Sequence, residues 1–213
     1  MITREKIFVI LLSMLIASIL SLVAIKYIYP NLRHKKTKKG DYWEVSYTTT
    51  KIGTGTNEVL GIVLHHTADS CIQESLFSLY KSELEVSCHA IIDKDGTRYI
   101  LAEPTSITWH AGYSMFNGRE KCNDFMIGIE FQGNTIENPL TQDQINSAID
   151  YVIPIMSQYH IPLENIVTHQ MIRKEWIDNH PQETIEKGVL EKTDITDEEY
   201  DRFLTAISLR FAM

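Results

Sequence analysis

Hydrophobic and polar positions follow two different periods along residues 59–211. Short runs of branched apolar residues bounded by polar or turn-forming residues are typical of buried strands. They occupy residues 59–64, 125–131 and 166–168. Two further runs, 88–93 and 97–101, flank Asp95 and Gly96, and an Asp-Gly pair in this setting predicts a β-hairpin.

Three longer segments place apolar residues three and four positions apart, which predicts amphipathic helices. These segments are residues 70–81, 141–159 and 196–211. The second and third begin with a capping box, a Thr followed three residues later by Gln or Glu, at Thr141 and Thr196. Pro154 predicts a local disturbance of the second helix. Because strands and helices are interleaved, we expect an α/β fold with a central mixed β-sheet flanked by helices.

The N-terminal segment has neither period. Residues 7–25 carry no charge, and a helix of that length reaches about 28 Å, close to a hydrocarbon core of roughly 30 Å. A cleaved signal peptide and a buried core helix are the alternatives, but the apolar run is long for the first and lacks the polar face of the second. We therefore expect an N-terminal transmembrane helix in contact with the lipid bilayer.

Charge divides the chain near the same place. Residues 1–40 hold eight basic residues and one acidic residue, whereas the rest of the chain holds 12 basic and 27 acidic residues. An acidic domain repels phosphate backbones, which argues against binding to nucleic acid. The chain is thus expected to comprise a membrane anchor (1–29), a basic linker (30–42) and a catalytic domain (43–213).

Histidines at strand ends are the candidate chemistry. His65 and His66 close the first predicted strand, and His169 follows the strand at 166–168. Zinc binds imidazole nitrogen and carboxylate oxygen, and a catalytic site leaves one position for water, so two His and one Asp or Glu would suffice. A hydrogen-bonded structural role is the alternative for each His. The three cysteines are expected to be small buried residues: Cys71, Cys88 and Cys122.

Two sequence blocks give these histidines a context. Trp-His-Ala-Gly stands at residues 109–112, and Gly-Arg-Glu-Lys-Cys-Asn-Asp-Phe-Met-Ile-Gly-Ile-Glu stands at residues 118–130. Together with the His-containing strand ends, the order and spacing resemble the zinc N-acetylmuramoyl-L-alanine amidases of the AmpD-like, peptidoglycan-recognition type. The resemblance covers about residues 58–205.

The resemblance implies a reaction and roles for several residues. The family hydrolyses the amide between the lactyl group of N-acetylmuramic acid, or its anhydro form, and L-Ala of the peptidoglycan stem peptide. By the resemblance, one zinc ion is bound by His65 and His169, and Glu130 is the general base. Peptidoglycan or a muropeptide is then the substrate.

The third ligand departs from the family pattern, because Lys-x-Asp is absent soon after the second His. Lys192 and Asp194 supply this pattern further on, so residues 173–190 are interpreted as an insertion that forms part of the cleft rim. Asp194 is then expected as the third ligand and Lys192 as the cation that stabilises the oxyanion. The rival ligands are Asp178 and His180.

Substrate contacts are expected from Trp109, His110, Arg119 and Lys121, with a core Trp and a structural His as the alternatives for the first two. A module that binds peptidoglycan without cutting it is the alternative function, and a zinc amidase for another amide is a third. Because intact cell wall lies outside the membrane, we expect a single-pass protein of a bacterial inner membrane with a periplasmic catalytic domain. The basic residues after the predicted span favour a cytoplasmic domain instead.

Overall fold

The computed structural model describes residues 35–47, 52–81 and 86–211. Within this part of the chain, seven strands form one mixed sheet in the order β1-β2-β5-β4-β8-β3-β9. They are β1 (Lys35–Lys39), β2 (Tyr42–Ser46), β3 (Gly61–His66), β4 (Ala90–Ile92), β5 (Arg98–Ile100), β8 (Met126–Phe131) and β9 (Ile166–Thr168). The neighbours β4, β8, β3 and β9 are all parallel, whereas β5 runs antiparallel to β4.

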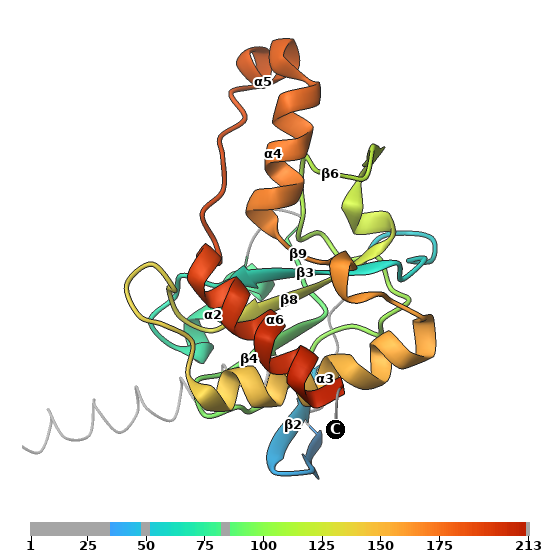
Figure 1. Ribbon diagram of the computed structural model, residues 1–213. Coiled ribbons are helices and arrows are strands. Elements are labelled where there is room, and N and C mark those ends of the chain that lie inside the picture. Colours follow the sequence, from blue (N-terminus) through green and yellow to red (C-terminus); the bar gives the residue numbers. More distant parts are fainter. Residues whose placement is uncertain (1–34, 48–51, 82–85, 212–213) are drawn as a thin grey trace, which may run out of the picture. The chain divides into compact units, whose positions relative to one another are not determined.

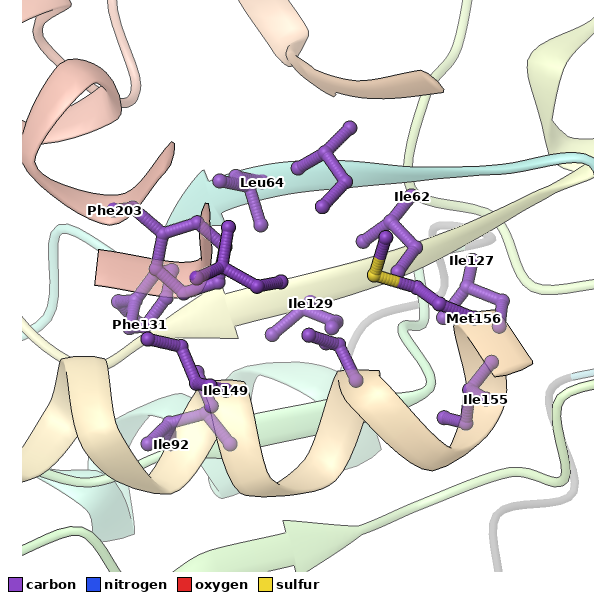
Figure 2. Packing of buried hydrophobic residues seen from close by; sticks show 14 of the residues in the cluster. Ile62, Leu64, Ile92, Ile127, Ile129, Phe131, Ile149, Ile155, Met156 and Phe203 are labelled. Atoms are coloured by element: carbon purple, nitrogen blue, oxygen red, sulfur yellow. The ribbon is translucent and has the colours of Figure 1, made fainter. Parts of the chain in front are cut away.

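Two helices cover one face of the sheet, α3 (Gln142–Tyr159) and α6 (Asp197–Phe211) (Figure 1). Figure 2 shows Leu64 and Ile129 of the strands packed with Ile149 and Phe203 of these helices. Alternate strand residues point to opposite faces, so each strand commits its even- and odd-numbered residues to different layers. The apolar layer between the sheet and helices α3 and α6 holds in place the strands whose ends carry the site residues.

The opposite face of the sheet is covered by α2 (Ile72–Lys81), by α4 (His169–Asn179) and by the segment between β5 and β8. That segment contains a short hairpin, β6 (Met115–Phe116) with β7 (Arg119–Glu120), and the 3-10 turn η1 (Cys122–Asp124). A second turn, η2 (Leu163–Asn165), precedes β9, and α5 (Pro181–Lys187) follows α4. His65 and Glu130 lie on this face.

The α/β fold and the expected central strands and helices are confirmed. The predicted capping box at Thr141 is present with Gln144, and α3 continues through Pro154. The first strand begins two residues later than expected because Val59 has a positive φ of 56°. Residues 35–39, expected as linker, form the edge strand β1, whose lysines are typical of an exposed sheet edge.

The expected transmembrane helix is corrected. In the part of the chain that the structure describes, no helix is long and apolar enough to cross a bilayer. The longest, α3, has 18 residues and is amphipathic, with its apolar side packed on the sheet. The described structure therefore does not support the predicted membrane helix as part of the fold, the bilayer contact or the single-pass membrane location. Residues 7–25 lie outside the described residues.

Candidate metal centre and adjoining clefts

Three side chains of the expected site stand at the carboxyl ends of adjacent parallel strands. His65 of β3 pairs in register with Glu130 of β8. On the other side of β3, Leu64 pairs with Thr168 of β9, so His169 follows at the level of His65. Because parallel strands end at the same edge of a sheet, side chains from three distant parts of the sequence meet there.

Asp194 completes a group of possible metal ligands. Its Oδ2 lies 3.0 Å from Nδ1 of His65 and 3.0 Å from Nδ1 of His169. One ligand atom from each of the three residues lies within 4.8 Å of the others. The backbone at Asp194 is held in place, because Thr135 Oγ1 donates to the Asp194 backbone carbonyl at 2.6 Å and the next residue, Ile195, is buried in the core.

The hydrogen bonds of His169 leave one nitrogen free for a cation. Its Nε2 lies 3.1 Å from the carbonyl of Ala111, and a carbonyl only accepts, so Nε2 carries the proton. The lone pair of Nδ1 then faces the carboxylate of Asp194. Burial alone would raise the pKa of Asp194, but the two histidines beside it hold that pKa well below its usual range, so the carboxyl group is ionised. Two acceptors facing each other at 3.0 Å require a proton or a metal ion between them.

His110 fixes the same tautomer in His65, with the proton on Nε2 and a lone pair on Nδ1. The carbonyl of Met126 lies 3.2 Å from His110 Nε2, so that nitrogen carries the proton and His110 Nδ1 accepts. His65 Nε2, 3.1 Å from His110 Nδ1, must therefore donate. The lone pair of His65 Nδ1 then also faces Asp194. Metal-binding histidines typically carry their proton on the ring nitrogen that does not bind the metal, where it is donated to a neighbouring group.

The donor set fits zinc. Two neutral imidazoles and one carboxylate, with a fourth position left open, are the composition of many catalytic zinc sites. Tetrahedral bonds of about 2.0–2.1 Å place ligand atoms about 3.3 Å apart. The Asp194 carboxylate oxygen lies 3.0 Å from each of the two imidazole nitrogens, which is already near that spacing. The described structure can therefore accept the ion with small adjustments.

The two sequence blocks, residues 109–112 and 118–130, contact each other and hold His110 in place beside the centre. Asn123 Oδ1 accepts from the backbone amides of His110 and Ala111 at 3.1 and 2.9 Å. A Cβ added to Gly128 would lie 2.4 Å from His110 Cγ, so only glycine leaves room for that ring. Asn123 and Gly128 are supporting residues that the sequence analysis did not single out, although both lie inside the quoted block.

Glu130 faces the centre with an unused oxygen. Its Oε2 is buried and has no hydrogen-bond partner within the described structure. Burial raises the pKa of Glu130 to about 7, partly offset by His65. A carboxylate with this pKa can accept and return a proton near neutral pH. Lys192 is exposed and lines the same cleft.

The rival ligands lie elsewhere. Asp178 is exposed and pairs with Lys174 at 2.8 Å, one helical turn away. His180 bonds to the carbonyl of Trp176 through Nδ1, and its Nε2 is 3.3 Å from Glu120. Neither residue joins the His65 group within the described chain.

Two clefts adjoin each other at the centre. The metal cleft, with a volume of about 500 Å³, contains His65, Glu130, His169 and Asp194. The second, which we call the arm cleft, has a volume of about 700 Å³. Both are lined by Trp109, Gly112, Asn123 and Arg173.

The remaining predicted substrate contacts divide between these clefts and the surface. Trp109 lines both clefts and His110 lines the metal cleft, whereas Lys121 lines the arm cleft. Arg119 lines neither: it forms a bidentate ion pair with Glu58 and lies over the ring of Phe125.

One wall of the arm cleft is formed by α4 from Arg173 onward and by α5, and we call this part the arm (residues 173–187). In Figure 1, α4 extends away from the sheet, with β6 beside it and α5 at its far end. Glu175 accepts from the amides of Asn117 and Gly118 at 3.2 and 2.8 Å. Trp176 packs against Tyr113 with ring centroids 4.9 Å apart. Residues 173–190, which we interpret as an insertion, thus contain most of α4 and all of α5, and Glu175 holds them to the β6–β7 hairpin.

The family of this chain follows from a comparison with known domains. The N-acetylmuramoyl-L-alanine amidase family model matches residues 55–183. The chain therefore belongs to this amidase family, as the sequence resemblance predicted. The matched region includes His65, Glu130 and His169, and it ends before Lys192 and Asp194.

Individual relatives agree with this assignment. The chain is 42% identical over 90 residues to the 1,6-anhydro-N-acetylmuramyl-L-alanine amidase AmpD of Haemophilus influenzae, covering 41% of this chain and 47% of the relative. It is 31% identical over 123 residues to the N-acetylmuramoyl-L-alanine amidase AmiD of Escherichia coli, covering 51% and 44%. The chain thus spans about half the length of the curated relatives it matches.

Solved structures show the same fold. PlyL superimposes with a TM-score of 0.53 at 22% identity, covering 76% of this chain and 94% of that one. A structure of AmpD superimposes with a TM-score of 0.52 at 24% identity, covering 60% and 81%.

Proposed function

We propose that this chain is a zinc-dependent hydrolase that cleaves the amide between N-acetylmuramic acid, or its anhydro form, and L-Ala of the peptidoglycan stem peptide. The observation that carries the proposal is the convergence of two imidazole lone pairs on the Asp194 carboxylate, beside the unpaired oxygen of Glu130. Family membership supplies the substrate class.

His65, His169 and Asp194 would hold one zinc ion. Zinc in such a site supplies Lewis acidity, which polarises a carbonyl and makes water more acidic. Ala111 and His110 keep the ligand nitrogens of His169 and His65 unprotonated, so the site is preorganised for the ion.

Glu130 is the proposed proton carrier. Its Oε2 accepts the proton of the attacking water and then donates it to the nitrogen of L-Ala as the amide breaks. The Lys192 ammonium is the proposed second positive charge opposing the developing oxyanion, since it lines the same cleft. Trp109, shared by both clefts, and Lys121 are proposed to contact the substrate.

The test uses the full-length chain loaded with zinc. It is incubated separately with intact sacculi and with soluble anhydro-muropeptides, and products are identified by mass spectrometry. We expect free stem peptide beginning with L-Ala, and its loss when a chelator removes the metal. If zinc binds but neither substrate is cut, a peptidoglycan-binding module on the same fold becomes the better interpretation.

A further inference from the structure

Arg173 occupies a position on α4 where an apolar residue is expected. The buried residues of this helix are His169, Ile172, Arg173 and Trp176, the spacing of a core-facing stripe. The Arg173 residue is only 8% exposed, yet it lines both the metal cleft and the arm cleft. A charged residue on the buried face of a helix is unusual and indicates a specific purpose.

The Arg173 guanidinium is poorly satisfied. Its Nε is buried without a hydrogen-bond partner, and its two Nη atoms reach the carbonyls of Leu190 and Ala111 only at 3.5 Å. Burial lowers its pKa, because the charged form is partly stripped of water. Among the described residues, no carboxylate forms an ion pair with it. A buried charge in this state is costly unless something else pairs with it.

Two other charged residues of the arm cleft, Lys187 and Glu120, are already paired. Lys187 forms an ion pair with Glu183 and lies 5.0 Å from the ring centre of Tyr113. Glu120 faces His180 at 3.3 Å. Lys121 also lines the cleft but is exposed to water, whereas the donors of Arg173 are buried at the cleft.

The surroundings hold the guanidinium in place. Gly112 has a φ of +54°, and a Cβ there would come within 3.1 Å of Arg173 Nη2, so a larger residue would crowd the guanidinium. On the next turn of α4, Trp176 packs against Tyr113, and Glu175 accepts from two backbone amides of the β6–β7 region. The donors are thus presented from a rigid helix, which suits recognition of a planar anion.

We propose that Arg173 binds a free carboxylate of the peptide part of the substrate, and that the stem peptide therefore lies toward the arm cleft. This inference rests on the proposed function. The only carboxyl group of N-acetylmuramic acid is consumed in the scissile amide, so remaining carboxylates of a muramoyl peptide lie on its peptide side. A guanidinium binds a carboxylate through two parallel hydrogen bonds. Because Arg173 lines both clefts, this contact would orient the peptide side of the substrate toward the arm cleft.

The experiment compares two muramoyl tripeptides that differ only in whether the peptide carboxylates are free or converted to carboxamides. The zinc-loaded full-length chain should cut the free-carboxylate form with a kcat/KM about 10- to 100-fold higher, the range of one charge-assisted interaction. Arg173→Met should reduce this preference to near one, mainly through KM. Arg173→Lys should retain part of it, since a point charge replaces the planar fork.

Lys174→Met is the matched control, because Lys174 is the next residue, is exposed and forms its ion pair with Asp178 in the described part of the chain. It should keep the wild-type preference. Zinc content and melting temperature of each variant identify any variant that fails to fold, in which case Arg173→Lys carries the test. Equal losses on both substrates in a folded Arg173 variant would overturn the proposal and leave a structural role.

Calorimetry with the free peptide product separates this inference from the proposed function. If the wild-type chain cuts neither substrate but binds the carboxylate peptide, and Arg173→Met abolishes that binding, then the hydrolase proposal fails and the carboxylate site stands. If both substrates are cut at the same rate by the wild-type chain, the hydrolase proposal stands and the carboxylate site is overturned.

Discussion

The strand-end centre and the arm are held by different means. His65, Glu130 and His169 extend from the ends of parallel strands whose other face is packed under α3 and α6. The arm leaves this core and is secured by a few contacts, chiefly Glu175 with backbone amides and Trp176 with Tyr113. Groups that must be placed to a fraction of an ångström lie on the most constrained part of the molecule. The arm forms one wall of the cleft toward which we propose that the stem peptide lies.

The largest effect should come from removing the third ligand. Asp194→Ala takes away the carboxylate between two imidazole nitrogens, each 3.0 Å away. We expect zinc content to fall to near zero and hydrolysis to fall to background, measured by elemental analysis and product release. Asp178→Ala, in the arm, should keep both. Zinc loss in Asp178→Ala but not in Asp194→Ala would move the third ligand into the arm.

Glu130→Gln should lower turnover without lowering zinc content. The amide cannot accept the proton of water, so turnover should fall about 10²–10⁴-fold, the usual contribution of a general base. Zinc content should remain that of the wild-type chain, because Glu130 is outside the ligand group. Near-normal turnover in this variant would show that another residue moves the proton.

His110→Ala should lower the affinity for the metal, although His110 contacts the ligand His65 and is not itself in the ligand group. It removes the acceptor for His65 Nε2, 3.1 Å distant, and so frees the ring of His65 to change tautomer. Loss of such an outer partner typically reduces metal affinity about 10- to 100-fold. Competition with a chelator measures this. Gly128→Ala should shift affinity in the same direction, because its methyl would collide with the His110 ring. Unchanged affinity in a folded His110→Ala would contradict the tautomer argument.

The smallest effect is expected from loosening the arm. Glu175→Ala removes two hydrogen bonds to the amides of Asn117 and Gly118. We expect KM for a muramoyl peptide to rise about two- to tenfold, while kcat and zinc content stay the same. Lys174→Ala on the same helix should leave KM unchanged. A fall in zinc content in Glu175→Ala would show that the arm and the centre are not independent.

The site was predictable from sequence where a residue lies at the end of a strongly patterned strand. His65, Glu130 and His169 belong to short apolar runs or sequence blocks, and their meeting follows from parallel pairing. The arm was less predictable. Its first helix presents Arg173 on the buried face, which breaks the apolar pattern, and a sequence reader sees only a charged stretch. The basic residues of the edge strand β1 likewise predict a linker, because they lack an apolar pattern.

The sequence by itself determined the fold class, the family and the residue types available for chemistry, because these depend on local period and on short blocks of fixed spacing. The sequence favoured Asp194 over Asp178 and His180 as the third ligand, and the tertiary structure brings Asp194 to His65 across 129 positions of the chain. Only the tertiary structure decided that His110 fixes the tautomer of His65 and that Arg173 is buried with unused donors. These properties arise from contacts between elements that are distant in sequence. Local sequence patterns do not specify such contacts.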